Sequence, residues 1–121
     1  MRPLFHPTAE AITVEGILHA LADPVRAQIF AAIVRADGAQ TCSNFLEVNG
    51  KAVPKSTLSQ HFRVLREAGL IRSERQGVEL HNTPRSDELQ ARFGALVCAI
   101  VDAHAAQTQR SARRKQRVKA A

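Results

Sequence analysis

Apolar residues recur every three to four positions in several stretches of the 121-residue chain, which is the spacing of one face of an α-helix. One stretch begins at Glu10 and predicts a first helix. A second helix should begin at Asp23 and Pro24, because Asp accepts hydrogen bonds from the free amides of a first turn and Pro has no amide to lose there. Asp37 and Gly38 end it. The first third of the chain is therefore predicted to form two helices.

The middle of the chain predicts two further helices separated by a turn. A short third helix is expected over residues 43–48, and Pro54 cannot continue a helix. A fourth helix is expected over residues 56–68, with Ser56 as its cap and Gly69 at the left-handed stop position. The apolar residues of this helix share one side, which we expect to be buried: Leu58, Phe62 and Leu65.

Two short runs of alternating polar and apolar residues follow, LIRSER and VELHNT. Gln76 and Gly77 separate them, and Gly tolerates the positive φ that a tight hairpin needs. Ser86 then caps a long fifth helix, with Asp87 and Glu88 favourably placed in its first turn. The apolar stripe of this helix is wide enough to be buried on more than one side, which predicts a dimer seam: Leu89, Phe93, Leu96, Val97, Ile100 and Val101.

The order of these elements is that of a winged helix-turn-helix, in which a helix enters the major groove of DNA and a hairpin forms the wing. The predicted fold is mainly α with a β-hairpin wing, built from about five helices whose terminal members form the dimer seam. One domain is expected over residues 10–107, because a chain of this length rarely buries two cores. Residues 1–9 are predicted to be a flexible arm, and residues 108–121 a basic disordered tail.

The charge of the chain is unevenly distributed. Seventeen basic and eleven acidic residues give a formal net charge of +6. Residues 1–109 contain eleven of each kind, so the whole excess lies in residues 110–121. Residues 51–75 hold a second, local excess of six basic over two acidic residues. The basic tail is either a solvated end or a source of non-specific attraction for phosphates.

The sequence also indicates in which cellular compartment the protein is found. No apolar run approaches the roughly 18 residues that a membrane span needs, and MRPLFHPTAE lacks the apolar centre of a signal peptide. Cys42 and Cys98 are too few for a disulfide framework and too far apart in sequence for a local metal knuckle. We therefore expect a cytoplasmic protein without a membrane partner.

Two segments of the chain, LADPVRAQIF and STLSQHFRVLREAGLIRSERQG, resemble the ArsR family of dimeric bacterial transcriptional regulators. The resemblance extends over about residues 15–105. It implies that residues 56–68 are the DNA-reading helix and residues 70–83 the wing. The turn NGKAVP before the reading helix is longer than the usual turn of the family.

The predicted reading helix presents hydrogen-bonding groups on the sides that its apolar residues leave free. Gln can pair with adenine and Arg with guanine, while Ser and Thr reach a base edge or a phosphate. Lys55, Arg72 and Arg75 are expected to flank the helix against phosphates without reading sequence. A solvated helix face explains any one of these residues equally well, but the whole group beside a wing favours DNA contact. The predicted DNA-contacting residues are Lys55, Ser56, Thr57, Ser59, Gln60, His61, Arg63, Arg66, Arg72, Arg75 and Gln76.

Ser59 and His61 do not indicate a catalytic pair, because residues two apart point to nearly opposite sides of a helix. No acidic residue nearby completes a triad. The sequence also lacks a Gly-rich phosphate loop and a His-Glu-x-x-His motif. We therefore expect no enzymatic activity and no cofactor.

Many ArsR relatives bind a metal or an oxidant that releases DNA, so the resemblance raises the question of a sensor. One family site uses a close thiolate pair where this chain has only Cys42. Another uses Asp-x-His followed by His and an acid; Asp102 and His104 match the first half, but no His, Asp or Glu comes later. Cys42 and Cys98 could form a redox pair or part of a subunit-bridging site, although Cys98 lies on the apolar stripe, which favours a structural role. No metal site is predicted, and the weak sensor candidates are Cys42, Cys98, Asp102 and His104.

These patterns predict a sequence-specific regulator that binds double-stranded DNA. The expected form is a homodimer, joined through the first and last helices, that represses transcription by occluding a near-palindromic operator, with any effector unidentified. The alternative is a winged-helix module that binds another protein and no specific DNA, since a fold does not guarantee a function. The polar residues at positions 57–66 argue against this alternative.

Overall fold

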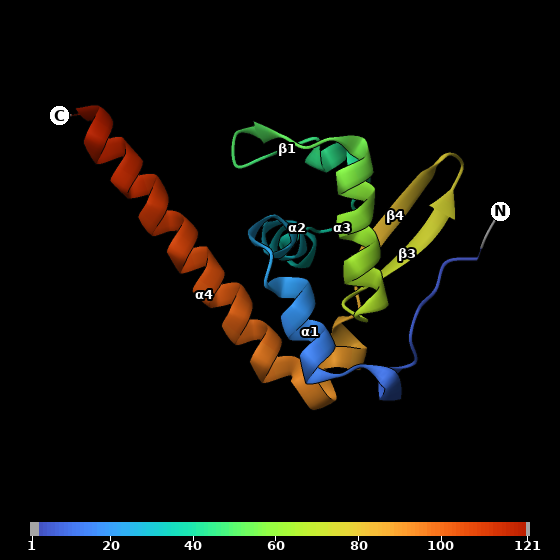
Figure 1. Cartoon of the computed structure of the whole chain (residues 1–121). Helices are drawn as coiled ribbons and strands as arrows, with labels where there is room; N and C mark the ends of the chain where they lie inside the picture. Colours follow the sequence, from blue (N-terminus) through green and yellow to red (C-terminus); the bar gives the residue numbers. More distant parts are fainter. Residues whose placement is uncertain (1–2, 121) are drawn as a thin grey trace.

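The computed structural model of the chain describes residues 3–120, with side chains for residues 3–118. It consists of helices that surround a small core, a β-hairpin on one side and a long C-terminal helix (Figure 1). In chain order the elements are η1 (Ala9–Ala11), α1 (Val14–Leu21), α2 (Pro24–Arg35), η2 (Cys42–Phe45), β1 (Glu47–Val48), β2 (Lys51–Ala52), α3 (Lys55–Glu67), β3 (Ile71–Gln76), β4 (Glu79–Pro84) and α4 (Ser86–Ala120). Within residues 3–120 no single helix is long and apolar enough to cross a bilayer, and α1 and α2, which reach that length only together, are bent by 106°.

The start of α2 is as predicted. The carboxylate of Asp23 accepts hydrogen bonds from the backbone N–H groups of Val25 and Arg26, at 2.8 and 3.1 Å. Pro24 occupies the first turn. The helix before it is shorter than expected, because Glu10 lies in the separate turn η1 and α1 begins only after Thr13, whose hydroxyl accepts from the N–H of Gly16.

The predicted third helix over residues 43–48 is wrong. Only the 3-10 turn η2 forms there, where the side chain of Asn44 accepts a hydrogen bond from Thr41 N at 2.8 Å. The chain then folds back on itself in a small hairpin, in which β1 pairs with β2. Asn49 and Gly50 make the reversal with φ values of 55° and 77°, which suits the two residue types that best tolerate positive φ.

The cap predicted for the next helix is also wrong. α3 begins with Lys55, and Pro54 rather than Ser56 stands at its N-terminal boundary. Pro54 O accepts the first helical hydrogen bond from Leu58 N at 2.9 Å. No side chain caps α3 among the residues that the structure describes. Because proline already has a fixed φ, it sets the direction of the chain into the helix without a side-chain cap.

The end of α3 is fixed by close packing. Gly69 has a φ of 84°, as a left-handed helix stop requires. A methyl group added there would come within 2.5 Å of Ile12 Cγ1. The turn therefore brings the segment before α1 against the C-terminal end of α3.

The predicted wing is present. β3 and β4 pair antiparallel from Ile71 opposite Pro84 to Gln76 opposite Glu79, and Gly77 turns the chain with a φ of 65°. An additional bridge between Gln40 and Asn82 ties the loop after α2 to β4. The wing is thus joined to the helical body at its base, while its tip projects into solvent (Figure 1).

Both ends of the chain differ from the prediction. The described part of the N-terminal arm is packed rather than flexible, because His6 Nε2 accepts from Ser73 N at 3.0 Å and Pro7 O accepts from Arg85 Nη1 at 2.8 Å. The C-terminal tail is helical up to residue 120, whereas the sequence predicts disorder over 108–121; residue 121 lies outside the described part. Ala, Arg, Gln and Lys favour helix, and no Gly or Pro follows Gly94.

One core joins all four helices and the wing. The predicted apolar side of α3 is completely covered, and α4 contributes part of its stripe to the same core. The buried apolar residues from these two helices are Leu58, Phe62, Leu65, Leu89, Phe93, Val97 and Val101. Leu96 and Ile100 are only partly buried, and Cys98, expected on the buried stripe, is exposed.

Candidate nucleic-acid interface

The exposed side of α3 carries a group of polar and cationic side chains. Burial of the apolar side fixes which residues these are, because side chains three or four positions apart share a face. Arg63 is 62% exposed and has a loose contact of 3.8 Å with Glu67. Such an exposed pair contributes little and leaves the guanidinium available for another acceptor. The exposed set consists of Lys55, Ser56, Thr57, Ser59, Gln60 and Arg63.

His61 does not belong to this exposed set, contrary to the prediction. Its side chain is buried, and Nδ1 has no hydrogen-bond partner among the described residues. Burial lowers the pKa of His61, an effect that the nearby charge of Asp23 opposes. A neutral imidazole packed between helices is not placed to meet a phosphate, so His61 acts as part of the packing of α3.

A shallow cavity of about 310 Å³ lies beside His61. Residues from the first turn of α2 and the first two turns of α3 line it: Arg26, Ser56, Thr57, Gln60 and His61. Arg26 is held by hydrogen bonds from its guanidinium to Ala20 O and His19 O, at 2.8 and 3.3 Å. The hollow therefore has a fixed cation on one wall and the exposed amide and hydroxyl groups of α3 on the other.

Arg66 is likewise buried rather than exposed. Its Nε donates to Ser73 Oγ at 3.1 Å, and Ser73 Oγ donates to Asn82 Oδ1 at 2.6 Å. The amide of Asn82 in turn donates to Gln40 O at 3.0 Å. This buried network joins α3, both strands of the wing and the loop after α2. Arg66 thus sets the position of the wing relative to α3 and is not available to DNA.

The base of the wing holds a second cationic cluster. Glu88 receives hydrogen bonds from Arg85 and from Arg72, whose Nη2 lies 2.9 Å from Glu88 Oε1. These two arginines lower the pKa of Glu88 to about 2, with Arg85 the larger cause. Arg72, predicted to contact phosphate, is therefore engaged by an acid of the same chain. Arg75 and Gln76, nearer the wing tip, are exposed as expected.

A cavity of about 420 Å³ separates the wing from α3. Its walls are partly apolar, from Leu46, Leu58 and Leu80, and Lys55 borders it from the first turn of α3. Cys42 also lines this cavity, and burial raises the pKa of its thiol. A raised pKa keeps the sulfur protonated, which disfavours metal ligation and nucleophilic attack.

The other sensor candidates are not gathered into a metal site. Cys42 and Cys98 are both free thiols. His104 Nε2 contacts Gln28 Oε1 at 3.1 Å and so joins α4 to α2. The described residues contain no group of three or more His, Cys, Asp and Glu side chains that could hold a metal ion. The half-motif formed by Asp102 and His104 is therefore not completed within the described part of one chain.

Sequence reasoning misses the polar network beneath the wing. Ser73 and Asn82 look like ordinary strand residues in the sequence, although the tight turn at Gly77 places them directly opposite each other. That register, which the turn makes predictable, indicates a polar pair on the inward side of the hairpin. Nothing in the local sequence indicates that Arg66 reaches this pair.

Comparison with known proteins agrees with this architecture. Residues 21–74 match the family model described as a helix-turn-helix domain. A solved structure, an ArsR-like transcriptional regulator from Rhodococcus sp. RHA1, is similar with a TM-score of 0.52 at 20% sequence identity, over 86% of this chain and 90% of that one. No curated protein matches the sequence to a significant degree. The matched domain and the shared fold confirm the predicted architecture: this chain contains a helix-turn-helix domain and has a winged helix-turn-helix fold similar to that of an ArsR-like regulator.

Proposed function

We propose that the protein is a transcriptional regulator that reads duplex DNA with the exposed face of α3. The observation that carries the proposal is the separation of the two sides of this helix. Leu58, Phe62 and Leu65 are buried in the core on one side, and the exposed side consists of hydroxyl, amide and cationic groups beside a projecting wing. Gln60 and Arg63 are the residues with the geometry to pair bidentately with adenine and guanine, while Lys55 and Ser56 suit phosphate contacts.

The proposed active form is a homodimer that represses transcription by occluding a near-palindromic operator. α1 leaves Val14 and Leu18 exposed, at 40% and 48%, which suits a surface that a second copy covers. Pairing through α1 and α4 would present two α3 helices to successive major grooves roughly 34 Å apart. The acting compartment would be the cytoplasm, where such DNA is accessible.

The test begins with selection of bound duplexes from a random double-stranded library, followed by footprinting. Gln60→Ala and Arg63→Ala should each weaken binding to the selected duplex about 5- to 150-fold, which corresponds to roughly 1–3 kcal/mol per base contact. Arg35→Ala is the matched control, because Arg35 is an exposed arginine at the far end of α2. The affinity and footprint of the Arg35→Ala variant should equal those of the wild type.

Unchanged footprints for Gln60→Ala and Arg63→Ala would reject α3 as the reading element. If the wild-type protein selects no duplex at all, DNA binding itself fails, and the protein-interaction alternative takes its place. Sedimentation of the free protein and of the complex would separately test whether two copies occupy one site.

A further inference from the structure

The last turns of α4 form a cationic surface that the fold does not use. Residues 109–118 are all exposed, so none of them belongs to the core. It carries Arg110, Arg113, Arg114, Lys115 and Arg117, and the sequence has no acidic residue after Asp102. None of these five cations has an ion-pair partner in the part of the chain that the structure describes.

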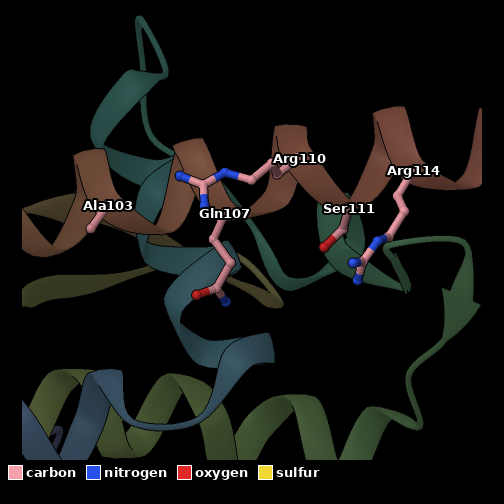
Figure 2. Close-up of a pocket in the computed structure, with 5 residues that line it drawn as sticks. All are labelled: Ala103, Gln107, Arg110, Ser111 and Arg114. Carbon is pink, nitrogen blue, oxygen red and sulfur yellow. The ribbon is translucent and has the colours of Figure 1, made fainter.

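One face of this segment forms a shallow cavity of about 440 Å³. Its lining residues are spaced so that they fall on one side of the helix: Ala103, Gln107, Arg110, Ser111 and Arg114. Figure 2 shows the guanidinium of Arg110 running back along α4 toward Gln107, and that of Arg114 turning toward Ser111. Figure 2 shows Ala103 at one end of this row and Arg114 at the other, so two guanidinium groups, an amide and a hydroxyl follow one another along the helix. Each of them can donate hydrogen bonds to an anion.

The spacing of the cations along this helical segment favours an anionic partner. Arg110 and Arg114 are four residues apart, as are Arg113 and Arg117, and like charges at that spacing repel and destabilise a helix. The segment continues a helix that the packed first half of α4 has already nucleated, so it is helical in spite of this repulsion. Neutralisation by phosphates would remove the repulsion, so ordering of the helix and binding of a polyanion favour each other.

The direction of α4 identifies which polyanion is within reach. In Figure 1 the C-terminal end of α4 lies toward the same edge of the molecule as the first turn of α3, the β1–β2 hairpin and the tip of the wing. The first turn of α3, which carries Lys55, Ser56 and Thr57, and the cationic end of α4 therefore lie toward one edge of the molecule. A duplex seated on α3 and extending beyond the bases that α3 reads would bring its backbone toward α4.

We propose that the face formed by Gln107, Arg110, Ser111 and Arg114 binds the phosphodiester backbone of duplex DNA that flanks the operator. This inference rests on the proposed function, because it needs a duplex positioned by α3. The interaction is independent of base sequence, so it adds affinity and salt dependence without changing which bases are selected.

The experiment compares two double variants that remove the same charge from the same helix. Arg110→Gln/Arg114→Gln changes the proposed face, and Arg113→Gln/Arg117→Gln changes a neighbouring side of the helix. Binding to the selected operator with flanking duplex is followed by fluorescence anisotropy over a series of salt concentrations. Removal of one phosphate-binding guanidinium should reduce the slope of log K against log salt by about 0.9, so removal of two should reduce it by roughly 1.8 per protomer.

The proposal expects this reduction for Arg110→Gln/Arg114→Gln and less than half of it for the control pair. It also expects the difference between wild type and Arg110→Gln/Arg114→Gln to disappear on a duplex that ends at the operator. Equal reductions for both pairs, or a difference that survives on the short duplex, would overturn the assigned face. Specific binding with no reduction for either pair would overturn it while leaving the proposed function intact. If the wild-type protein selects no sequence, the proposed function is rejected. The same salt series on a mixed-sequence duplex then still shows which of the two arginine pairs contacts the DNA backbone.

Discussion

The arginines of the folded body and those of the α4 extension contrast sharply. Arg66 and Arg85 are only 7% and 4% exposed, and each donates hydrogen bonds to fixed acceptors of the same chain. Arg110 and Arg114 are exposed on the last turns of α4, beyond the part of this helix that packs in the core. Arginine side chains therefore stabilise the fold in the folded body and remain available for a ligand in the α4 extension. A count of basic residues along the sequence cannot distinguish the two situations.

This contrast narrows the set of candidate DNA contacts. Of the cations predicted around the reading helix, Arg66 is buried and Arg72 is paired with Glu88. Lys55 and Arg63 remain exposed on α3. The local basic excess in residues 51–75 thus serves the structure of the wing as much as the proposed interface.

The largest expected difference between the two regions is in stability. Arg66→Ala should lower the free energy of unfolding by about 2–4 kcal/mol, because it removes a charged hydrogen bond to Ser73 and leaves a cavity under the wing. Arg114→Ala should change it by less than about 0.5 kcal/mol, as is usual for an exposed side chain. Urea denaturation followed by circular dichroism measures both. Equal destabilisation by the two substitutions would refute the division into structural and available arginines.

A smaller loss is expected at the base of the wing. Arg85→Ala should lower the free energy of unfolding by about 1.5–3 kcal/mol, because the buried carbonyl of Pro7 loses its charged donor. It should also raise the pKa of Glu88, since Arg85 is the main cause of its low value of about 2. The ordinary carboxyl pKa is 4.5, so this carboxylate stabilises the fold above about pH 4.5 and the contribution is lost as the pH falls toward 2.

The free energy of unfolding, measured as a function of pH on the acid side, tests the expected rise in the pKa of Glu88. In Arg85→Ala the loss of stability attributable to Glu88 should begin at a higher pH than in the wild type, and the carboxyl resonance of Glu88 should titrate at a higher pH in NMR spectra. Glu88→Gln is the control, because it has no charge to lose over this range. A Glu88 resonance that titrates at the same pH with and without Arg85 would contradict the assigned cause.

The outline of the fold could be predicted from local signals with a direct physical cause. Asp23 and Pro24 start α2, Gly69 ends α3 and Gly77 turns the wing, each because the residue suits the backbone position it occupies. The failures lie where tertiary packing decides. The segment 43–48 has helical spacing, yet Asn49 allows a hairpin that pairs β1 with β2 instead.

The candidate site was predictable only in part, for a related reason. Helical spacing correctly separated the apolar side of α3 from its polar side, but the width of the buried side depends on what packs against it. The wing covers Arg66, and α2 lies beside His61, so the helical pattern alone wrongly places both side chains on the open surface. The local sequence does not predict the packed N-terminal arm, because its partners, Ser73 and Arg85, are more than sixty residues away in sequence.

The smallest predicted effect concerns the arm and its surrounding arginines. Burial, followed by the charges of Arg72, Arg66 and Arg85, lowers the pKa of His6, whose Nε2 accepts a hydrogen bond from Ser73 N. The unfolded chain therefore binds a proton more readily than the folded one, so stability should decrease as the pH falls below about 6.5. Protonation also removes the lone pair that accepts from the wing.

His6→Gln isolates this contribution, because the amide oxygen of glutamine can still accept the hydrogen bond but does not titrate near neutral pH. Urea denaturation at pH 7.5 and pH 5.5 should show a smaller difference in unfolding free energy for His6→Gln than for the wild type. Part of the difference should remain, since burial also lowers the pKa of His61. If the two proteins lose the same stability between these pH values, the pKa of His6 is the same in the folded and the unfolded chain, and the arm is not held against the wing by an imidazole lone pair.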